Sequence, residues 1–139
     1  MALKGILLDT NAYAAFKRGI DESIEILRNA PIIGLNTIVL GELLCGFAVG
    51  KYEAINKQEL KLFISCHRVN LFSIGDNTAE YYSKVYTQLK LKGQPIPTND
   101  MWVAATALEH GLAIFSYDSH FQSIDGIIVG NRLQDFVYM

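Results

Sequence analysis

The chain has 139 residues, half of them apolar, and its 12 basic and 14 acidic side chains give a formal net charge of −2. This length and composition are typical of one compact domain with one core, so we expect a single domain over residues 1–139. The small negative charge argues against a protein that coats nucleic acid through a broad basic surface. Any contact with nucleic acid is therefore expected to be local.

The apolar stretches are interrupted every few residues by charge or glycine, and none reaches the roughly 20 residues that a membrane-spanning helix needs. Residues 1–5 lead directly into a strand-like segment and lack the features of a signal peptide. We therefore expect a cytoplasmic protein without membrane contact. Cys45 and Cys66 are the two cysteines, and no Cys or His spacing resembles a zinc site. Both thiols are expected to be reduced and buried.

The first half of the chain alternates strand-like and helix-like patterns. A continuous apolar run is typical of a strand covered on both faces, and polar capping residues after such a run mark a helix start. The helix expected at 38–48 is apolar on nearly all sides and is therefore expected to be buried. The expected elements are a strand at 5–8, a helix after Asp9, a helix at 21–30, a strand at 32–35, and the helix at 38–48 capped by Asn36 or Thr37.

The second half continues the same alternation, with turn signals at Gly93 to Pro97 and at Gly111. The expected elements are a surface helix at 51–66, a strand at 69–72, helices at 77–92 and 99–110, the second capped by Thr98, and strands at 113–115 and 126–130. Strands that alternate with helices along the whole length define the α/β fold class. No internal repeat or linker divides the chain.

Three acids are placed where ligands bind in an open α/β sheet. Such sites form beyond the carboxyl ends of the strands, where loops and helix N-termini meet. Asp9 directly follows the first apolar run, and Asp118 comes three residues after Phe115, the end of a later strand. Asp100 falls in the first turn of the helix expected after Thr98. We therefore expect these three carboxylates to line one edge of the sheet.

Each of these acids also has an ordinary structural interpretation, as a helix cap, a partner of a helix dipole or a turn residue. Glu42 differs, because its neighbours at helical spacing are apolar or small: Ile38, Val39, Cys45 and Gly46. A carboxylate in such surroundings is strongly unfavourable unless a cation or several hydrogen bonds compensate. Glu42 therefore joins the candidate set.

Four acids that meet without four bases repel one another, and a divalent cation relieves this repulsion. Oxygen ligands select Mg²⁺ or Mn²⁺ over Zn²⁺. His67, His110 and His120 are not paired at ligand spacing, so we assign none of them to the site. A Mg²⁺ site of this kind can activate water and neutralise charge on a phosphate.

Four segments resemble the motifs of PIN-domain nucleases in order and spacing, and each carries one of the four acids. They are residues 7–11 (LLDTN), 41–46 (GELLCG), 99–107 (NDMWVAATA) and 116–121 (SYDSHF). The resemblance covers essentially the whole chain. Within the family, the compact size is most similar to the VapC-type toxins of prokaryotic toxin–antitoxin pairs.

The resemblance implies a central parallel sheet flanked by helices, a magnesium-dependent endoribonuclease activity, and homodimers inhibited by a cognate antitoxin. It also implies that Asp9, Glu42, Asp100 and Asp118 are the catalytic and metal-binding acids, with Thr10 and Ser116 as supporting hydroxyl groups. We therefore expect the toxin component of a type II toxin–antitoxin pair, which hydrolyses RNA phosphodiester bonds with a metal-activated water. Mn²⁺ is expected to substitute for Mg²⁺.

Other functions also fit parts of the pattern. An aspartyl-phosphate phosphatase or a receiver domain places an acid after the first strand, but Asn11 stands where the phosphatase needs a second acid. A PIN-like protein that only binds RNA or a partner gains nothing from an acidic cavity that repels phosphate. A housekeeping RNA-processing nuclease stays open beside the toxin, because fold likeness carries no information about the substrate.

Overall fold

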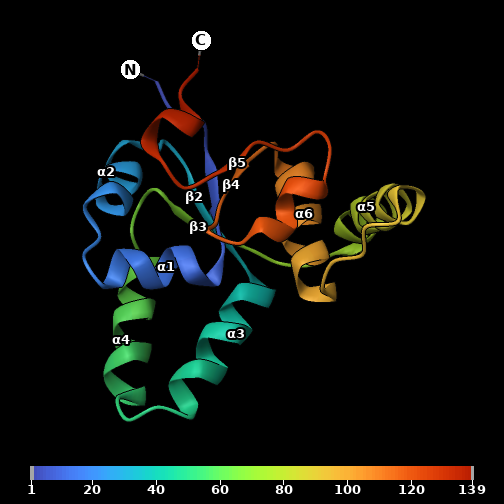
Figure 1. Cartoon of the computed structure of the whole chain (residues 1–139). Helices are drawn as coiled ribbons and strands as arrows, with labels where there is room; N and C mark the ends of the chain where they lie inside the picture. Colours follow the sequence, from blue (N-terminus) through green and yellow to red (C-terminus); the bar gives the residue numbers. More distant parts are fainter. Residues whose placement is uncertain (1, 139) are drawn as a thin grey trace.

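The computed structural model describes residues 2–138 and shows a central sheet flanked by helices (Figure 1). The strands are β1 (Ile6–Leu8), β2 (Ile33–Asn36), β3 (Val69–Phe72), β4 (Ala113–Phe115) and β5 (Val129–Gly130). The helices are α1 (Thr10–Lys17), α2 (Asp21–Asn29), α3 (Thr37–Ala48), α4 (Glu53–Ile64), α5 (Asp76–Lys92) and α6 (Thr98–His110), with short 3-10 helices η1 (Ser119–Ser123) and η2 (Leu133–Phe136). The α/β prediction is confirmed. The last strand is shorter than expected, because residues 126–128 precede the β-ladder.

The five strands run in the order β3-β2-β1-β4-β5, and all four neighbouring pairs are parallel. β1 is central, and Ile6, Leu7 and Leu8 are completely buried, as the continuous apolar run predicts. From β1 the chain moves outward through β2 to β3, and then returns to the other side of β1 as β4. Loops that leave β1 and β4 therefore diverge, and the crevice between them is the usual ligand site of such sheets.

The register between β1 and β4 places the carboxyl ends of the two strands at the same height in the sheet. Leu8 is opposite Phe115, and the backbone N–H of Asp9 donates to the carbonyl oxygen of Phe115 at 3.1 Å. Consequently Asp9 and Ser116, the residues that follow the two strands, lie side by side at the carboxyl edge.

Side-chain caps begin two of the helices, α1 and α3. The side chains of Asp9 and Asn36 cap α1 and α3 by accepting hydrogen bonds from the backbone N–H groups of Thr10 and Val39, at 2.9 and 2.8 Å. Gly111 ends α6 with φ of +65°, a conformation that only glycine adopts readily. The prediction that Thr98 caps α6 is wrong. Thr98 is the first helical residue, and Pro97 precedes it without a side-chain cap.

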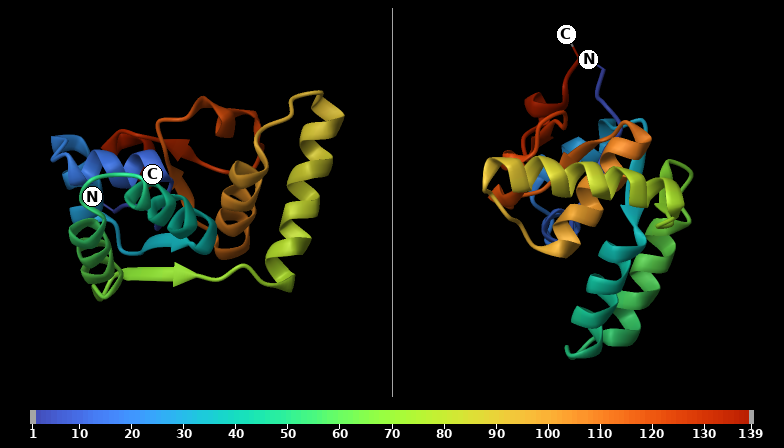
Figure 2. Two further views of the ribbon diagram at one scale, coloured as in Figure 1. Left: turned by 90° about the horizontal axis from the view of Figure 1, so that it is seen from below. Right: turned by 90° about the vertical axis from the view of Figure 1, so that its right-hand side faces the viewer.

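The prediction that the apolar helix at 38–48 is buried is also wrong. In α3 only Val39 and Leu43 are buried. Figure 2 shows the reason, since α3 and α4 lie side by side as a hairpin that extends away from the sheet, so that part of α3 faces solvent. An apolar sequence reports a preference for burial, but whether another layer covers the helix depends on the tertiary fold.

The same hairpin explains a second correction. Cys45 and Cys66 are free thiols, as expected, but both are exposed rather than buried. Cys45 lies on the uncovered side of α3, and Cys66 comes just after α4. Among residues 2–138, no helix is both long and apolar enough to cross a membrane.

Candidate active site

Asp9 is the most buried of the four candidate acids, with 5% of its surface exposed. As the cap of α1 it accepts the Thr10 backbone N–H through Oδ1 at 2.9 Å. Its other oxygen, Oδ2, accepts the Ser116 hydroxyl at 2.9 Å and lies 3.5 Å from the Asn11 amide nitrogen. Both oxygens are therefore held in fixed directions by residues of the two central strand ends.

Ser116 and Asn11 also fix the loop that follows β4. The Ser116 hydroxyl oxygen accepts the backbone N–H of Asp118 at 3.0 Å, and the Asn11 side-chain oxygen accepts that of Tyr117 at 3.0 Å. We call Asp9, Thr10, Asn11 and Ser116 the inner group. Its hydrogen bonds join the start of α1 to the loop that carries Asp118.

Glu42 comes from α3 and is partly buried between two other elements. Its Oε1 accepts the Thr10 hydroxyl at 2.9 Å, and its Oε2 accepts the Asn99 side-chain amide at 3.1 Å. The compensation that a carboxylate on this apolar helix requires is thus supplied in part by hydrogen bonds from α1 and α6.

Asp100 and Asp118 meet at a histidine. His120 Nδ1 lies 2.8 Å from Asp100 Oδ2 and 3.0 Å from Asp118 Oδ1. The Asp118 side chain also caps η1 by accepting the His120 backbone N–H at 2.9 Å. We call Asp100, Asp118 and His120 the outer group, because its side chains are more exposed: 14%, 30% and 46%, respectively.

The electrostatics reflect burial and crowding of negative charge. Burial raises the pKa of Asp9, and the charges of Asp100 and Glu42 raise it further, against the hydrogen bonds from Thr10 and Ser116. Burial likewise raises the pKa of Asp100, with the Asp118 charge adding to it and the His120 hydrogen bond opposing it. Burial is the largest cause in both cases, because it penalises the charged form of the carboxyl group.

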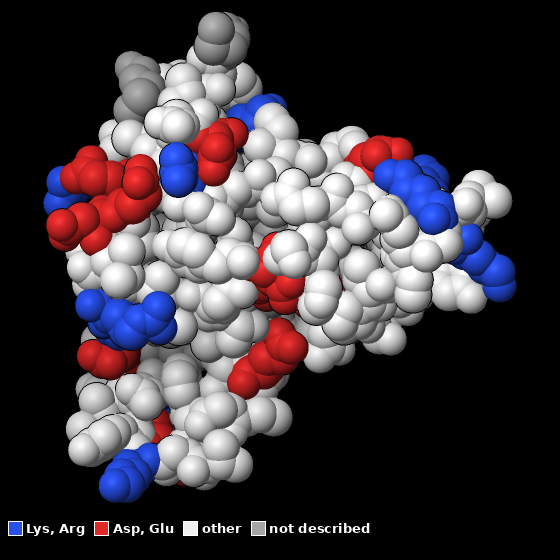
Figure 3. All heavy atoms as spheres, in the orientation of Figure 1, with Lys and Arg blue, Asp and Glu red and all other residues white. Residues whose placement is uncertain are grey.

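The acidic neighbours of His120 favour its protonated form. The hydrogen bond to Asp100 raises the pKa of His120, with further contributions from the charges of Asp118, Asp100 and Asp9. Within residues 2–138, no Lys or Arg forms an ion pair with any of the four candidate acids. Figure 3 shows acidic side chains in the middle of the face, while the Lys and Arg side chains in view lie further out. The site is a cluster of acids, and within residues 2–138 the basic side chain that pairs with them is His120.

The structure brings together all four acids that the sequence nominates, together with Thr10 and Ser116. Sequence reasoning missed Asn11, Asn99 and His120. Asn99 adjoins Asp100, and Asn11 lies two residues after Asp9, so proximity to a nominated acid was an available signal. His120 was set aside because no second histidine accompanies it, and its partners, Asp100 and Asp118, are carboxylates from another helix and from its own loop.

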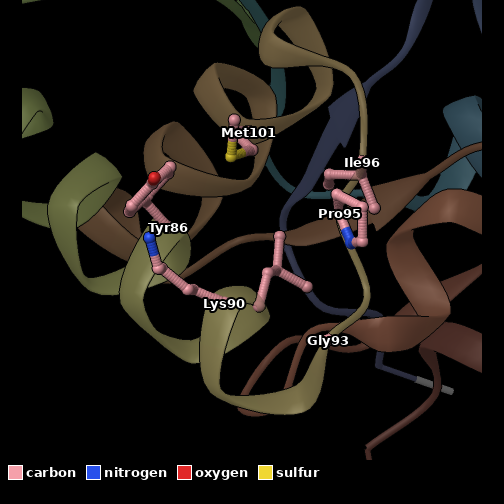
Figure 4. A pocket seen from close by; sticks show the side chains of 7 residues that line it. Tyr86, Lys90, Gly93, Pro95, Ile96 and Met101 are labelled. Carbon is pink, nitrogen blue, oxygen red and sulfur yellow. The ribbon is translucent and has the colours of Figure 1, made fainter.

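Away from the acidic site, a hollow of about 300 Å³ lies between α5, α6 and the loop that joins them. Figure 4 shows Tyr86, Lys90, Ile96 and Met101 around it. Its lining is mainly apolar and contains no carboxylate, so it offers no ligand to a hard cation. The acidic site at the strand ends is the better candidate for chemistry.

The donor chemistry of the acidic site fits a divalent cation. Asp100, Asp118 and His120 each offer a ligand atom, and these atoms lie within 4.8 Å of one another. Asp9 and Glu42 add two further carboxylates near this set. The charge of Glu42 raises the pKa of both Asp9 and Asp100, and the charge of Asp100 raises the pKa of Asp9.

A parallel α/β fold with such a site at the switch between β1 and β4 defines the class of protein. The sequence model of the PIN domain matches residues 6–127, and the chain belongs to the PIN domain family. Family membership removes the phosphatase and receiver alternatives.

Similar proteins agree with this assignment. The chain is 29% identical to Ribonuclease VapC2 of Rickettsia felis over 130 residues, which cover 90% of this chain and 96% of that protein. The crystal structure of VapBC2 from Rickettsia felis bound to a promoter DNA fragment matches with a TM-score of 0.78 and 26% identity, over 91% of this chain and 98% of that one. The structure of FitAcB from Neisseria gonorrhoeae matches with a TM-score of 0.77 and 26% identity, over 91% and 96%.

Proposed function

We propose that this protein is a magnesium-dependent endoribonuclease and the toxin of a type II toxin–antitoxin pair. The observation that carries the proposal is the convergence of four acids, without Lys or Arg partners among residues 2–138, at the switch point of a PIN fold. Similarity to Ribonuclease VapC2 over 96% of that protein's length supports the activity.

Asp9, Glu42, Asp100 and Asp118 would hold the cation, Mg²⁺ or Mn²⁺. When bound, the cation lowers the pKa of a water and neutralises charge on the phosphate oxygens. The residues of the chain do the positioning. Thr10 donates to Glu42, and Ser116 donates to Asp9, so each hydroxyl fixes one carboxylate oxygen.

The four acids disfavour binding of RNA when no cation is present. They repel a phosphodiester, and within residues 2–138 no Lys or Arg pairs with them to offset that repulsion. A bound cation would offset this repulsion. The acid set therefore favours a hydrolase over a protein that only binds RNA.

The partners follow from the relatives. The structure of VapBC2 from Rickettsia felis is bound to a DNA fragment from their promoter, and a chain of that structure shares this fold over 91% of the present chain. We propose a corresponding antitoxin, a homodimer of this chain, and action on RNA in the cytoplasm. Sequencing of the adjacent reading frames shows whether one encodes a small protein. Inhibition of cleavage by such a protein would identify a toxin, and its absence would favour a housekeeping nuclease.

The test of the activity uses purified protein and structured RNA with Mg²⁺, Mn²⁺ or EDTA. We expect cleavage with either ion, none in EDTA, and products with 5′-phosphates. Asp125→Asn is the matched control, because this acid pairs with Lys92 at the surface, outside the site. Cleavage that persists in EDTA, or 3′-phosphate products, would contradict the metal mechanism. Binding of RNA without cleavage would favour the non-catalytic alternative.

A further inference from the structure

His120 lies between two acids of the proposed metal site, although it belongs to no acid position of the motifs. Its Nδ1 is 2.8 Å from Asp100 Oδ2 and 3.0 Å from Asp118 Oδ1. The three ligand atoms form a compact set within 4.8 Å of one another. A single imidazole nitrogen thus approaches two carboxylates from different elements, α6 and the loop after β4.

Three donor atoms within 4.8 Å of one another are close enough to contact one cation. His120 Nδ1 is within hydrogen-bonding distance of both carboxylate oxygens, so the three side chains already converge.

The local backbone holds the imidazole in this position. Asp118 caps η1 and accepts the His120 backbone N–H at 2.9 Å, which closes a short turn and directs the ring back toward the acids. The Asp118 backbone N–H is in turn fixed by Ser116, at 3.0 Å. The orientation of His120 is therefore tied to the inner group through two consecutive hydrogen bonds.

We propose that His120 is a nitrogen ligand of the divalent cation, together with Asp100 and Asp118, and that it shifts the selectivity of the site toward Mn²⁺ over Mg²⁺. The inference rests on the proposed metal-dependent function. Mg²⁺ prefers oxygen donors and gives up its water reluctantly, whereas imidazole suits the transition metals. One nitrogen donor in a set of oxygen donors therefore increases the affinity for Mn²⁺ more than the affinity for Mg²⁺.

The first test measures binding of Mn²⁺ and Mg²⁺ to the whole chain by calorimetry at one pH, for the wild type and His120→Asn. We expect the Mn²⁺ affinity to fall about 10-fold or more, and the Mg²⁺ affinity to fall by a factor of about three or less. His67→Asn is the matched control, because this exposed histidine follows α4, outside the outer group. An unchanged ratio of the two affinities in His120→Asn would overturn the inference.

A second measurement does not depend on a variant. Pulsed electron paramagnetic resonance of bound Mn²⁺ detects coupling to a directly ligated histidine nitrogen, and ¹⁵N-histidine labelling identifies it. We expect this coupling in the wild type and in His67→Asn, and its loss in His120→Asn. Mn²⁺ bound without nitrogen coupling would overturn the role of His120 and leave the acid site standing. Failure of the wild type to bind either ion would overturn the proposed metal function as well.

Discussion

The inner and outer groups of the acidic site are built in different ways. Asp9 and Ser116 follow two adjacent strands whose hydrogen-bonded register places them side by side, so the inner group is fixed by the central sheet. Asp100 and Asp118 come from a helix start and a short loop, and they meet through His120. The sheet therefore fixes the inner group through strand register, whereas the outer group depends on contacts between α6 and the loop after β4.

The two groups also balance charge differently. Asp9 is nearly inaccessible, and burial raises its pKa despite the hydrogen bonds from Thr10 and Ser116. Burial also raises the pKa of Asp100, but the hydrogen bond with His120 lowers it. We therefore expect the inner group to lower the stability of the metal-free protein more than the outer group does.

The largest expected effect is on catalysis, where both groups are required. Asp9→Asn and Asp100→Asn should each reduce kcat/KM for RNA more than about 100-fold, since loss of a ligand exceeds the 10–100-fold typical of its supporting partners. Initial rates at saturating Mg²⁺ measure this, with Asp125→Asn as the active control. Full activity of Asp100→Asn would remove the outer group from the site.

Binding of the cation should stabilise the folded protein. At a free Mg²⁺ concentration about 100 times the Kd, the expected gain in unfolding free energy is about 2.7 kcal/mol. Thermal melts with Mg²⁺ and with EDTA measure it, and Asp9→Asn and Asp100→Asn should respond far less. An equal response of Asp100→Asn would mean that Asp100 serves as a first-turn residue of α6 and not as a ligand.

Ser116→Ala tests the link between the two groups. This change removes the hydroxyl that donates to Asp9 and accepts the Asp118 backbone N–H. We expect a loss of about 10–100-fold in metal affinity or activity, the range typical of groups that orient ligands. Ser119→Ala, at an exposed position of the same loop, is the control. Wild-type affinity in Ser116→Ala would show that the groups are held independently.

The smallest expected effect concerns stability and pH. The raised pKa of Asp9 means that the folded chain holds this proton more tightly than the unfolded chain does. Asp9 therefore contributes stability below its ordinary pKa of 3.8, and this contribution is lost as pH rises through the raised value. In EDTA at pH 7, Asp9→Asn should be more stable than the wild type by about 1 kcal/mol, and this advantage should vanish toward pH 4.

The amide is compatible with the local hydrogen bonds. Its oxygen can accept the Thr10 backbone N–H, and its nitrogen can donate to Ser116, whose hydroxyl can turn toward the Asn11 oxygen 3.4 Å away. Asp118→Asn should gain less, because solvent screens its more exposed carboxylate. Denaturant unfolding across this pH range checks both variants. A loss of stability in Asp9→Asn at pH 7 would show that the acid is mainly a structural cap.

The sequence by itself determined the alternation of strands and helices and the positions of most of their ends. Local patterns carry this information, because three or four apolar residues in a row specify a buried strand and a polar residue after them specifies a cap. Asp9 and Asn36 cap α1 and α3 accordingly. It also nominated the four acids that meet, since the carboxyl ends of parallel strands share one edge of the sheet.

Only the tertiary structure decided which surfaces are covered and which side chains pair across elements. The uncovered side of α3 and the exposed Cys45 depend on the α3–α4 hairpin extending away from the sheet, which no local periodicity encodes. The placement of His120 depends on the cap of η1 and on the docking of α6, which brings Asp100 to it from 20 residues away in the chain. Such contacts join distant segments, and their free energy arises only when the segments pack together.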